Sequence, residues 1–595
     1  MYWKTALMYS GIGFMQLMLL LSTGIFILQT LKIKLSMQWK FLFYALCIGQ
    51  YVWAISAALY YTQAKTVLAG SLPLIVLALV ITKTSPSAEL TSYQPKTYKK
   101  LIKPLFLLPI IWAWTSILNF YCVSLKGNSL YLPHFDILHS IKISLHLQKT
   151  GIETYYHWQN TSFLFPYHYI EIWLHAAIQT FWNLQPTWLA MQVLIPILQL
   201  TLIVGLLALL EQYQKKVDVF WFILACGFIT FQGWLNFSLP YYDTQFSFTR
   251  YSSMIGVPKF MVIGTVALLF ILIPSKLRWI VFSLLPIFSI LTFPIAIFLM
   301  LAEFVRNQNK LALICAAWTT IWILTFYFFT AEPNLSNDNF TYFFPTLNNK
   351  FIYMQGYFLC FVFFFYLPTF LGLKQDRESM FVLCTTAVVG YVLQVMFYRW
   401  YDSYQFLFLL LLPFLWSYSW LVAIRSQLRQ VKVVLCCVLL VALFQSLWYK
   451  RDFQRTAVDN HWIDEIYAYL STLDILDKGA AVWYYDTRQT DLFCWKDKPV
   501  RIIPLLATNI YFDRNTNPKD YDVVTEQIIQ TKLPFRYSYQ SSLEEQILHF
   551  CQANQVRFLV YPHKYFFIQS AKMNKVLRRF ENTKEHLSCV VLDWR

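Results

Sequence analysis

The sequence predicts an all-α polytopic membrane protein that carries a small C-terminal α/β soluble domain. The chain of 595 residues is 57% hydrophobic and only 13% charged. Apolar runs of about 20 residues, the length of helix that crosses a bilayer core, recur over most of its length. These runs are continuous rather than alternating, so they predict helices and not the strands of a barrel.

The apolar runs define the expected membrane helices. They lie at 6–31, 41–61, 66–82, 103–123, 188–210, 218–237, 257–274, 278–304, 310–329, 351–373, 379–398, 403–424 and 432–449. The first run is too long for the core of a cleaved signal and predicts a span. We expect about 13–14 transmembrane helices, divided into extra N-terminal helices (1–102), a membrane core (103–450) with a long loop at 124–187, and a soluble domain (451–595).

The net charge of +17 does not indicate nucleic-acid binding. The excess Lys and Arg lie mainly in short connections between apolar runs, as in the cytoplasmic loops of membrane proteins. The 11 cysteines are mostly scattered within the predicted spans and include no CxxC pair. The sequence therefore predicts neither a zinc site nor a disulfide framework.

The basic residues also predict orientation. Five lysines place the loop 83–103 in the cytoplasm, which puts the loop 124–187 outside. A single span at 278–304 would then put Arg306 outside, so we expect a hairpin that turns near Ser289–Leu291, between Pro286 and Pro294. With this break, the loops 124–187, 238–256 and 330–350, the N-terminus and the C-terminal domain all lie on the extracytoplasmic side of a plasma or inner membrane.

The C-terminal domain is expected to alternate strands and helices. Strands are predicted at Ala480–Tyr485, Val556–Tyr561 and Leu587–Leu592, and helices at His461–Ser471 and Glu544–Gln552. The domain has no Gly-rich phosphate loop and no nucleophile elbow. We therefore interpret it as a lid or packing domain over the membrane part.

The loop 124–187 opens with a predicted helix over 136–149. Leu138, Ile141 and Leu145 share its apolar side, while an adjacent side is basic. The pattern is typical of a helix in the membrane interface. Asp136 stands at its start, where a carboxylate caps free N–H groups. The same carboxylate is equally placed to act as a catalytic or substrate-positioning acid at the mouth of a membrane cavity.

A second helix of this loop is predicted from Pro166. His168, Glu171 and His175 share one face at i, i+3 and i+7, and apolar residues fill the opposite face. We expect a solvated or hydrogen-bonded polar strip on an interfacial helix. A divalent metal held by these three side chains is an alternative, and Glu171 is a candidate for a second functional acid.

Charged residues near later loops form a further candidate cluster. Asp243, Arg250 and Lys259 follow one another in and after the loop 238–256. An Arg beside a membrane cavity can hold a lipid phosphate through two hydrogen bonds, or can simply extend to the interface. Arg399 and Asp402 could complete an anion site or pair with each other.

The layout resembles the GT-C superfamily of membrane glycosyltransferases. Its members have a long first extracytoplasmic loop with two interface helices, an acidic residue early in that loop, and often a soluble C-terminal domain on the same side. Here Pro133-His134-Phe135-Asp136 occupies the place of the early acidic motif. The acid at 136 stands alone, without a neighbouring Asp or Glu, and the sequon-recognition motif of oligosaccharyltransferases is missing.

The resemblance implies an enzyme that moves a sugar from a polyprenyl-phosphate-linked donor to an extracytoplasmic glycan, lipid or protein. Asp136 would then be the base, assisted by Glu171 or His168. Arg250, Lys259 or Arg399 would hold the phosphate, with His134 and Asp243 as further substrate-binding candidates. Apart from the open question of a divalent metal, no cofactor is implied; the partners are the donor, the acceptor and membrane lipids.

Three other classes remain open. Polysaccharide polymerases and O-antigen ligases are also polytopic with a large outside loop, but they usually lack a soluble domain of this size. A transporter or flippase of glycolipids would favour internal repeats and ionisable residues near the bilayer midplane, and the sequence shows neither. A structural or assembly role is the third, since a single acid is weak support for catalysis.

Overall fold

The structure is a computed structural model that describes the main helices and part of the C-terminal region. The described residues are 2–31, 37–61, 98–122, 125–126, 129–130, 140–141, 144, 147–148, 169–184, 186–214, 217–229, 258–273, 278–330, 366–374, 376–396, 404–425, 481–484, 556–562, 573–581 and 586–592. The spans expected at 66–82 and 432–449 lie outside them.

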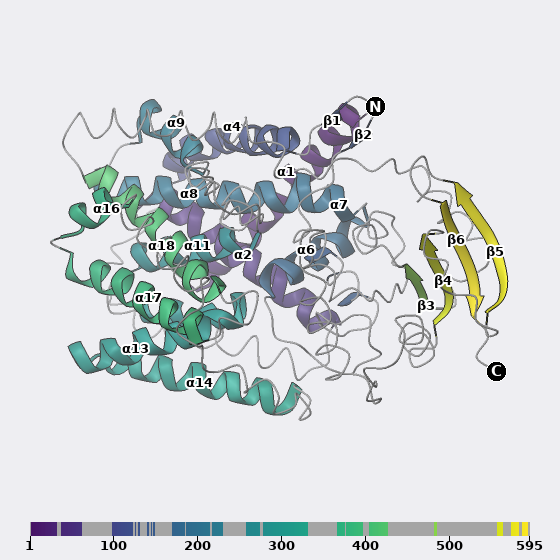
Figure 1. The fold of residues 1–595 in the computed structure, drawn as a ribbon. Helices are drawn as coiled ribbons and strands as arrows, with labels where there is room; N and C mark the ends of the chain where they lie inside the picture. Colours follow the sequence, from purple (N-terminus) through teal and green to yellow (C-terminus); the bar gives the residue numbers. More distant parts are fainter. Residues whose placement is uncertain are drawn as a thin grey trace.

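Helices dominate the described part of the chain (Figure 1). They are α1 (Tyr2–Thr30), α2 (Gln38–Tyr61), α4 (Tyr98–Cys122), α6 (Ile170–Trp182), α7 (Pro186–Leu189), α8 (Ile195–Gln214), α9 (Val219–Phe228), α11 (Pro258–Leu272), α12 (Arg278–Phe288), α13 (Phe293–Asn307), α14 (Lys310–Thr330), α16 (Leu367–Gly372), α17 (Arg377–Met396) and α18 (Tyr404–Arg425). A π-helical turn, η2 (Ala190–Leu194), precedes α8, and a 3-10 turn, η4 (Ile290–Thr292), precedes α13.

Five of the described helical segments are long and apolar enough to cross a membrane. They are Lys4–Thr30, Gln38–Tyr61, Ala190–Tyr213, Arg377–Met396 and Phe406–Arg425. Shorter apolar helices include α9, α11 and α12. The prediction of a helical membrane protein is therefore confirmed at this level.

Helix α8 forms the centre of the helical body. Its residues from Ile195 to Leu210 are all buried, and it contacts α2, α4, α9, α11 and α18. Two indole N–H groups of α18 fix that helix against its neighbours: Trp420 donates to the carbonyl oxygen of Leu206 at 2.9 Å, and Trp416 donates to that of Phe228 at 3.0 Å.

Helices α1 and α2 approach each other closely through glycine. A Cβ atom at Gly24 would overlap the carbonyl oxygen of Ala45, and a Cβ atom at Gly49 would overlap that of Leu20. Small residues at such a crossing allow two membrane helices to pack backbone against backbone. The absence of a side chain at these two positions therefore sets the distance between α1 and α2.

The apolar run at 278–304 is divided, as the charge pattern predicts. Helix α12 ends at Phe288, and α13 begins at Phe293 after the short η4 turn. Both ends of this pair reach the start of α17. Arg278 pairs with Glu378 at 2.7 Å, and the guanidinium of Arg306 lies 5.0 Å from the ring centroid of Phe381.

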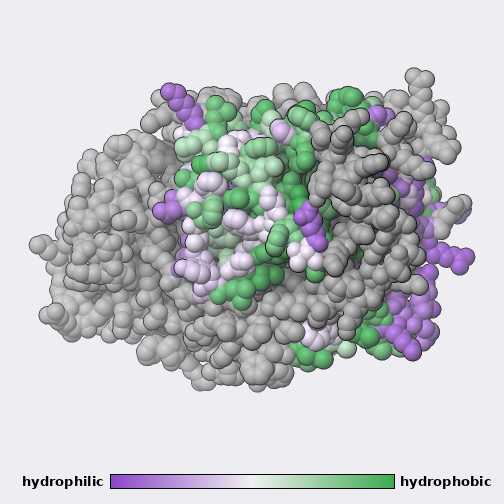
Figure 2. All heavy atoms as spheres, turned by 180° about the vertical axis from the view of Figure 1, so that it is seen from behind, coloured by the Kyte–Doolittle hydropathy of each residue, from purple (hydrophilic) through white to green (hydrophobic). Residues whose placement is uncertain are grey.

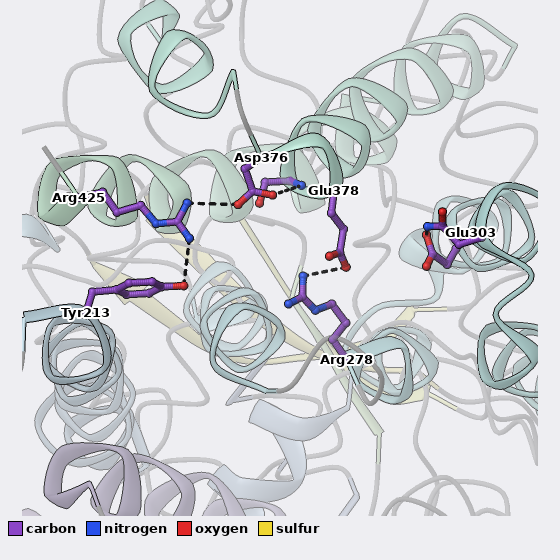
Figure 3. A network of polar contacts seen from close by, with 8 residues as sticks. Tyr213, Arg278, Glu303, Asp376, Glu378 and Arg425 are labelled. Carbon is purple, nitrogen blue, oxygen red and sulfur yellow. Dashed lines mark hydrogen bonds and ion pairs between the residues drawn. The ribbon is translucent and has the colours of Figure 1, made fainter. Parts of the chain in front are cut away.

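Polar side chains connect this end of the helical body (Figure 3). The Asp376 carboxylate accepts a hydrogen bond from the backbone N–H of Ser379 at 3.1 Å and pairs with Arg425 at 3.3 Å. Arg425 also donates to the Tyr213 hydroxyl at 3.1 Å. The contacts join the ends of α8, α17 and α18, and Arg278 adds the start of α12.

A carboxylate of α8 caps α2 at the same end. Glu211 accepts hydrogen bonds from the backbone N–H groups of Gln38 and Trp39 at 2.8 Å, and from that of Lys40 at 3.3 Å. The first N–H groups of a helix lack partners within the helix, and a carboxylate there is favoured by the helix dipole. The cap ties the start of α2 to the end of α8.

The described part of the C-terminal region is a four-stranded sheet. Its strands are β3 (Ala481–Tyr484), β4 (Val556–Pro562), β5 (Met573–Glu581) and β6 (His586–Leu592), in the order β3-β4-β6-β5. The pair β3 and β4 is parallel, whereas β6 is antiparallel to both β4 and β5. Three strands coincide with the predicted ones and β5 was not predicted; the two predicted helices lie outside the described residues.

Large apolar side chains are exposed on the outer helices. They occur on α1, α4, α9, α13 and α14, for example at Phe26, Phe106, Ile223, Val305 and Ile314. Figure 2 shows such apolar residues spread over the described part of one face. An exposed apolar surface of this kind fits contact with lipid chains.

Candidate functional site

Two of the predicted site residues belong to the described part of the chain. These are Glu171 and Lys259. The other six lie outside it: Asp136, His168, His134, Asp243, Arg250 and Arg399. The candidate site is therefore built from α6, from the loop segment that packs on it, and from the start of α11.

Helix α6 is inserted among the membrane helices. It contacts α2, α11 and α12. The N–H of Tyr169, just before the helix, donates to the carbonyl oxygen of Ile287 at 3.3 Å. Because Ile287 belongs to the last turn of α12, the start of α6 lies where the α12–α13 pair turns back.

The polar face of α6 is buried. Glu171, in the first turn, is 1% exposed, and His175, one turn later, is 2% exposed. The expectation of a solvated strip is wrong for these two residues, because α6 packs into the helical body instead of lying against water. The alternative expectation, a hydrogen-bonded strip, is confirmed for His175.

The partner of His175 comes from the first part of the loop. Nδ1 of His175 lies 2.9 Å from the hydroxyl oxygen of Ser144. Ser144 is fully buried, and Gln148, one turn later, donates to the carbonyl oxygen of Ala176 at 3.4 Å. The described residues 140–141, 144 and 147–148 are helical, in agreement with the helix predicted over 136–149.

Ile141, the one described member of the predicted apolar side of this first loop helix, is buried as that pattern predicts. Ile141 and Leu147 are buried together with Ser144. The prediction had grouped Ile141 with Leu138 and Leu145, which lie outside the described residues. The i, i+3 spacing of Ile141 and Ser144 was visible in the sequence, but a serine in an otherwise apolar and basic pattern gave no reason to select it.

Lys259 lies in the first turn of α11 and is 5% exposed. Helix α11 contacts both α6 and α12. A lysine and a glutamate are therefore both buried in the first turns of two contacting helices. Burying charges costs free energy unless other groups compensate, so such residues are concentrated at functional sites of membrane proteins.

Chemically, this arrangement offers three kinds of group. The Glu171 carboxylate can accept a proton or a hydrogen bond, His175 can relay a proton through the hydroxyl of Ser144, and Lys259 can neutralise an anion. Within the described residues, no group of three or more His, Cys, Asp or Glu side chains could hold a metal ion. In the predicted set of His168, Glu171 and His175, His168 lies outside the described residues.

Comparison with known proteins gives no family assignment. No protein-family model and no curated protein sequence matches the chain.

Proposed function

We propose that the chain is a membrane glycosyltransferase that moves a sugar from a polyprenyl-phosphate-linked donor to an extracytoplasmic acceptor. The observation that carries the proposal is the burial of Glu171 in the first turn of a loop helix that contacts the helix bearing buried Lys259. The reaction requires a proton acceptor for the attacking hydroxyl and a positive charge for the departing phosphate. The Glu171 carboxylate supplies the first, and the Lys259 ammonium supplies the second.

The reaction is a single displacement at the anomeric carbon. The acceptor oxygen forms a bond to that carbon while the bond from carbon to the phosphate oxygen breaks, and the electron pair leaves with the phosphate. Asp136 or Glu171 takes the hydroxyl proton, and Lys259 holds the phosphate together with Arg250 or Arg399. One displacement inverts the configuration of the sugar.

The charge pattern supports an extracytoplasmic active site. The basic residues Arg278, Arg306 and Arg425 lie on the polar end of the helical body, which we assign to the cytoplasm. Glu171 lies near the turn between α12 and α13, at the opposite end of these two helices from Arg278 and Arg306. A donor whose lipid chain lies in the bilayer would therefore reach Glu171 from the extracytoplasmic side.

The proposal is tested by transfer of labelled sugar from polyprenyl-phosphate donors to lipid and glycan acceptors in proteoliposomes. We expect Glu171→Gln to lower the rate at least 100-fold, as loss of a general base does. Glu303→Gln is the matched control, because Glu303 is also a buried glutamate but bonds to Asn307 at the polar end. Equal loss in both variants, or full activity in Glu171→Gln, would contradict the role of Glu171.

Asp136→Asn completes this experiment. Loss of transfer in Asp136→Asn with activity retained in Glu171→Gln would make Asp136 the base and Glu171 a structural residue. The absence of transfer from every donor by the wild-type protein would reject the transferase proposal.

A glycolipid transporter or flippase is the second candidate, favoured by one observation. The α12–α13 pair turns back inside the helical body, close to buried Glu171, and broken helices beside buried charges are frequent in transporters. The same proteoliposomes distinguish the two functions. A transporter would move a fluorescent glycolipid between leaflets without forming a new glycosidic bond.

A further inference from the structure

Neutral polar side chains gather where α1, α4, α6 and η2 meet. Helices α1, α4 and α6 all contact this π-helical turn. The indole N–H of Trp182 donates to Oε1 of Gln16 at 2.8 Å, and that of Trp112 donates to the carbonyl oxygen of Ser10 at 3.0 Å. We call this region the amide junction and define it by Gln16, Ser116, Gln179 and Gln192, with the indoles of Trp112 and Trp182.

The four named polar residues of the amide junction are nine-tenths or more buried, yet each keeps an atom without a hydrogen-bond partner within the described part of the chain. These atoms are Nε2 of Gln16, Oγ of Ser116, Oε1 of Gln179 and Nε2 of Gln192. A buried polar atom that lacks a partner destabilises the fold, because it has lost its hydrogen bonds to water without replacement. Folded proteins keep few such atoms, so several in one region point to a ligand that supplies the missing partners.

Cross-helix contacts link the helical turns that carry these four residues. Gly13 lies one turn before Gln16, and a Cβ atom at Gly13 would overlap the Trp112 ring and lie 3.1 Å from the backbone oxygen of Gln192. Ser116 follows Trp112 by one turn of α4. Gln179 precedes Trp182 by one turn of α6, and Trp182 bonds to Gln16.

The π-helical turn gives the junction a local distortion. The N–H of Ile195 bonds to the carbonyl oxygen of Ala190, five residues earlier, and Gln192 stands in the middle of this turn. Single π-helical turns inside α-helices are frequent at functional sites, because they re-aim side chains that a regular helix would direct elsewhere.

We infer that the amide junction binds a neutral sugar ring of the lipid-linked substrate; this inference rests on the proposed transferase function. Amides and hydroxyls both donate and accept hydrogen bonds, as the hydroxyls of a sugar require. The indoles of Trp112 and Trp182 add flat apolar faces. No residue that defines the junction is charged, so it suits a sugar rather than a phosphate.

Helix α6 connects the junction to the candidate catalytic site. Gln179 follows Glu171 by eight residues, which is about 12 Å along a helix. The bound ring is therefore not the reacting one. It is a further sugar, carried either by the polyprenyl-phosphate donor or by a glycolipid acceptor, and the junction positions it while the reaction proceeds near Glu171.

Equilibrium binding to the full-length chain in lipid nanodiscs tests the inference. The probes are polyprenyl-phosphate-linked disaccharides for the donor and diglucosyl diacylglycerol for the acceptor, each beside the same lipid without sugar. We expect the wild type to prefer at least one glycolipid over its sugar-free counterpart. Gln192→Met and Gln16→Leu should each lower that affinity about 10-fold, equivalent to roughly 1.4 kcal/mol.

Gln394→Leu is the matched control. Gln394 is also buried on a membrane helix, and both amide atoms lack a partner within the described residues, but it belongs to α17. We expect its replacement to leave glycolipid binding unchanged. Melting curves without glycolipid verify that each variant is folded. Removal of the Gln394 amide, both atoms of which lack a partner within the described residues, should leave the melting temperature unchanged or higher. Gln16→Leu also removes the acceptor of the Trp182 indole N–H and should lower the melting temperature modestly.

The inference would be overturned by wild-type protein that shows no sugar preference with either lipid series, or by folded Gln192→Met and Gln16→Leu variants that both bind as wild type. Glu171→Gln separates this result from the proposed function, since it should bind glycolipid normally and lose transfer. If the wild type binds the sugar in a Gln192-dependent way without transferring it, that result would support the amide junction as a sugar site and would reject the transferase proposal.

Discussion

Arg278 and Glu378 form an ion pair with 2.7 Å between Nη1 and Oε1, which ties the start of α12 to the first turn of α17. The two side chains are only 16% and 30% exposed. Because solvent screens this pair less than a surface pair, we expect a coupling of about 1 kcal/mol. A double-mutant cycle of Arg278→Met and Glu378→Gln, followed by unfolding in detergent, measures it. Additive effects of the two substitutions would show that the pair does not stabilise the fold.

Gly24→Ala and Gly49→Ala should each destabilise the protein by roughly 1–3 kcal/mol, because the new methyl group would overlap a backbone carbonyl across the α1–α2 contact. Gly11→Ala is the control, since no atom lies within 4 Å of the position of its Cβ. There, alanine should leave stability unchanged or raise it by up to about 1 kcal/mol. The measurement is the melting temperature of the three variants in detergent. Equal melting temperatures for Gly24→Ala, Gly49→Ala and Gly11→Ala would refute the close approach of α1 and α2.

Glu211→Gln should lower stability by about 1 kcal/mol, because the change removes the charge that three N–H groups of α2 share. Asp218→Asn is a suitable comparison. Asp218 caps α9 through a single bond to the N–H of Trp221 at 2.9 Å, and asparagine caps helices as well as aspartate does. Equal unfolding midpoints for wild type and Glu211→Gln would argue against the cap.

Trp420→Phe should cost about 2 kcal/mol, because it removes the indole bond to Leu206 and leaves a small cavity beside α8. Trp318→Phe provides the contrast, since the indole nitrogen of Trp318 has no hydrogen-bond partner within the described residues. Its replacement should cost clearly less. A reversed order in chemical unfolding experiments would show that the bond to Leu206 contributes little.

The helices and the break between α12 and α13 could be predicted because hydropathy and charge act locally. Pro286, Pro294 and the position of Arg306 were enough to place the turn within a few residues. The burial of Glu171 could not be predicted in this way. An amphipathic pattern shows which residues share a face, but it does not show whether that face meets water or another helix.

The amide junction was also invisible in the sequence. Gln16 lies far from Gln179 and Gln192 along the chain, and each of the three is flanked mainly by apolar residues. Their meeting depends on the close approach of α1 at Gly13 and on the extra residue in the η2 turn. Both are features of three-dimensional packing that leave no local periodicity.

The interruption between α12 and α13 has a consequence for every later segment. A continuous helix from Arg278 to Asn307 would be about 45 Å long, well beyond the roughly 30 Å thickness of a bilayer core. Such a rod would have to cross once and emerge on the far leaflet. The turn at Ser289–Thr292 therefore sets the topology of the rest of the chain. It decides whether the number of membrane crossings before α14 is odd or even. The side of the membrane on which the C-terminal sheet lies follows from that number.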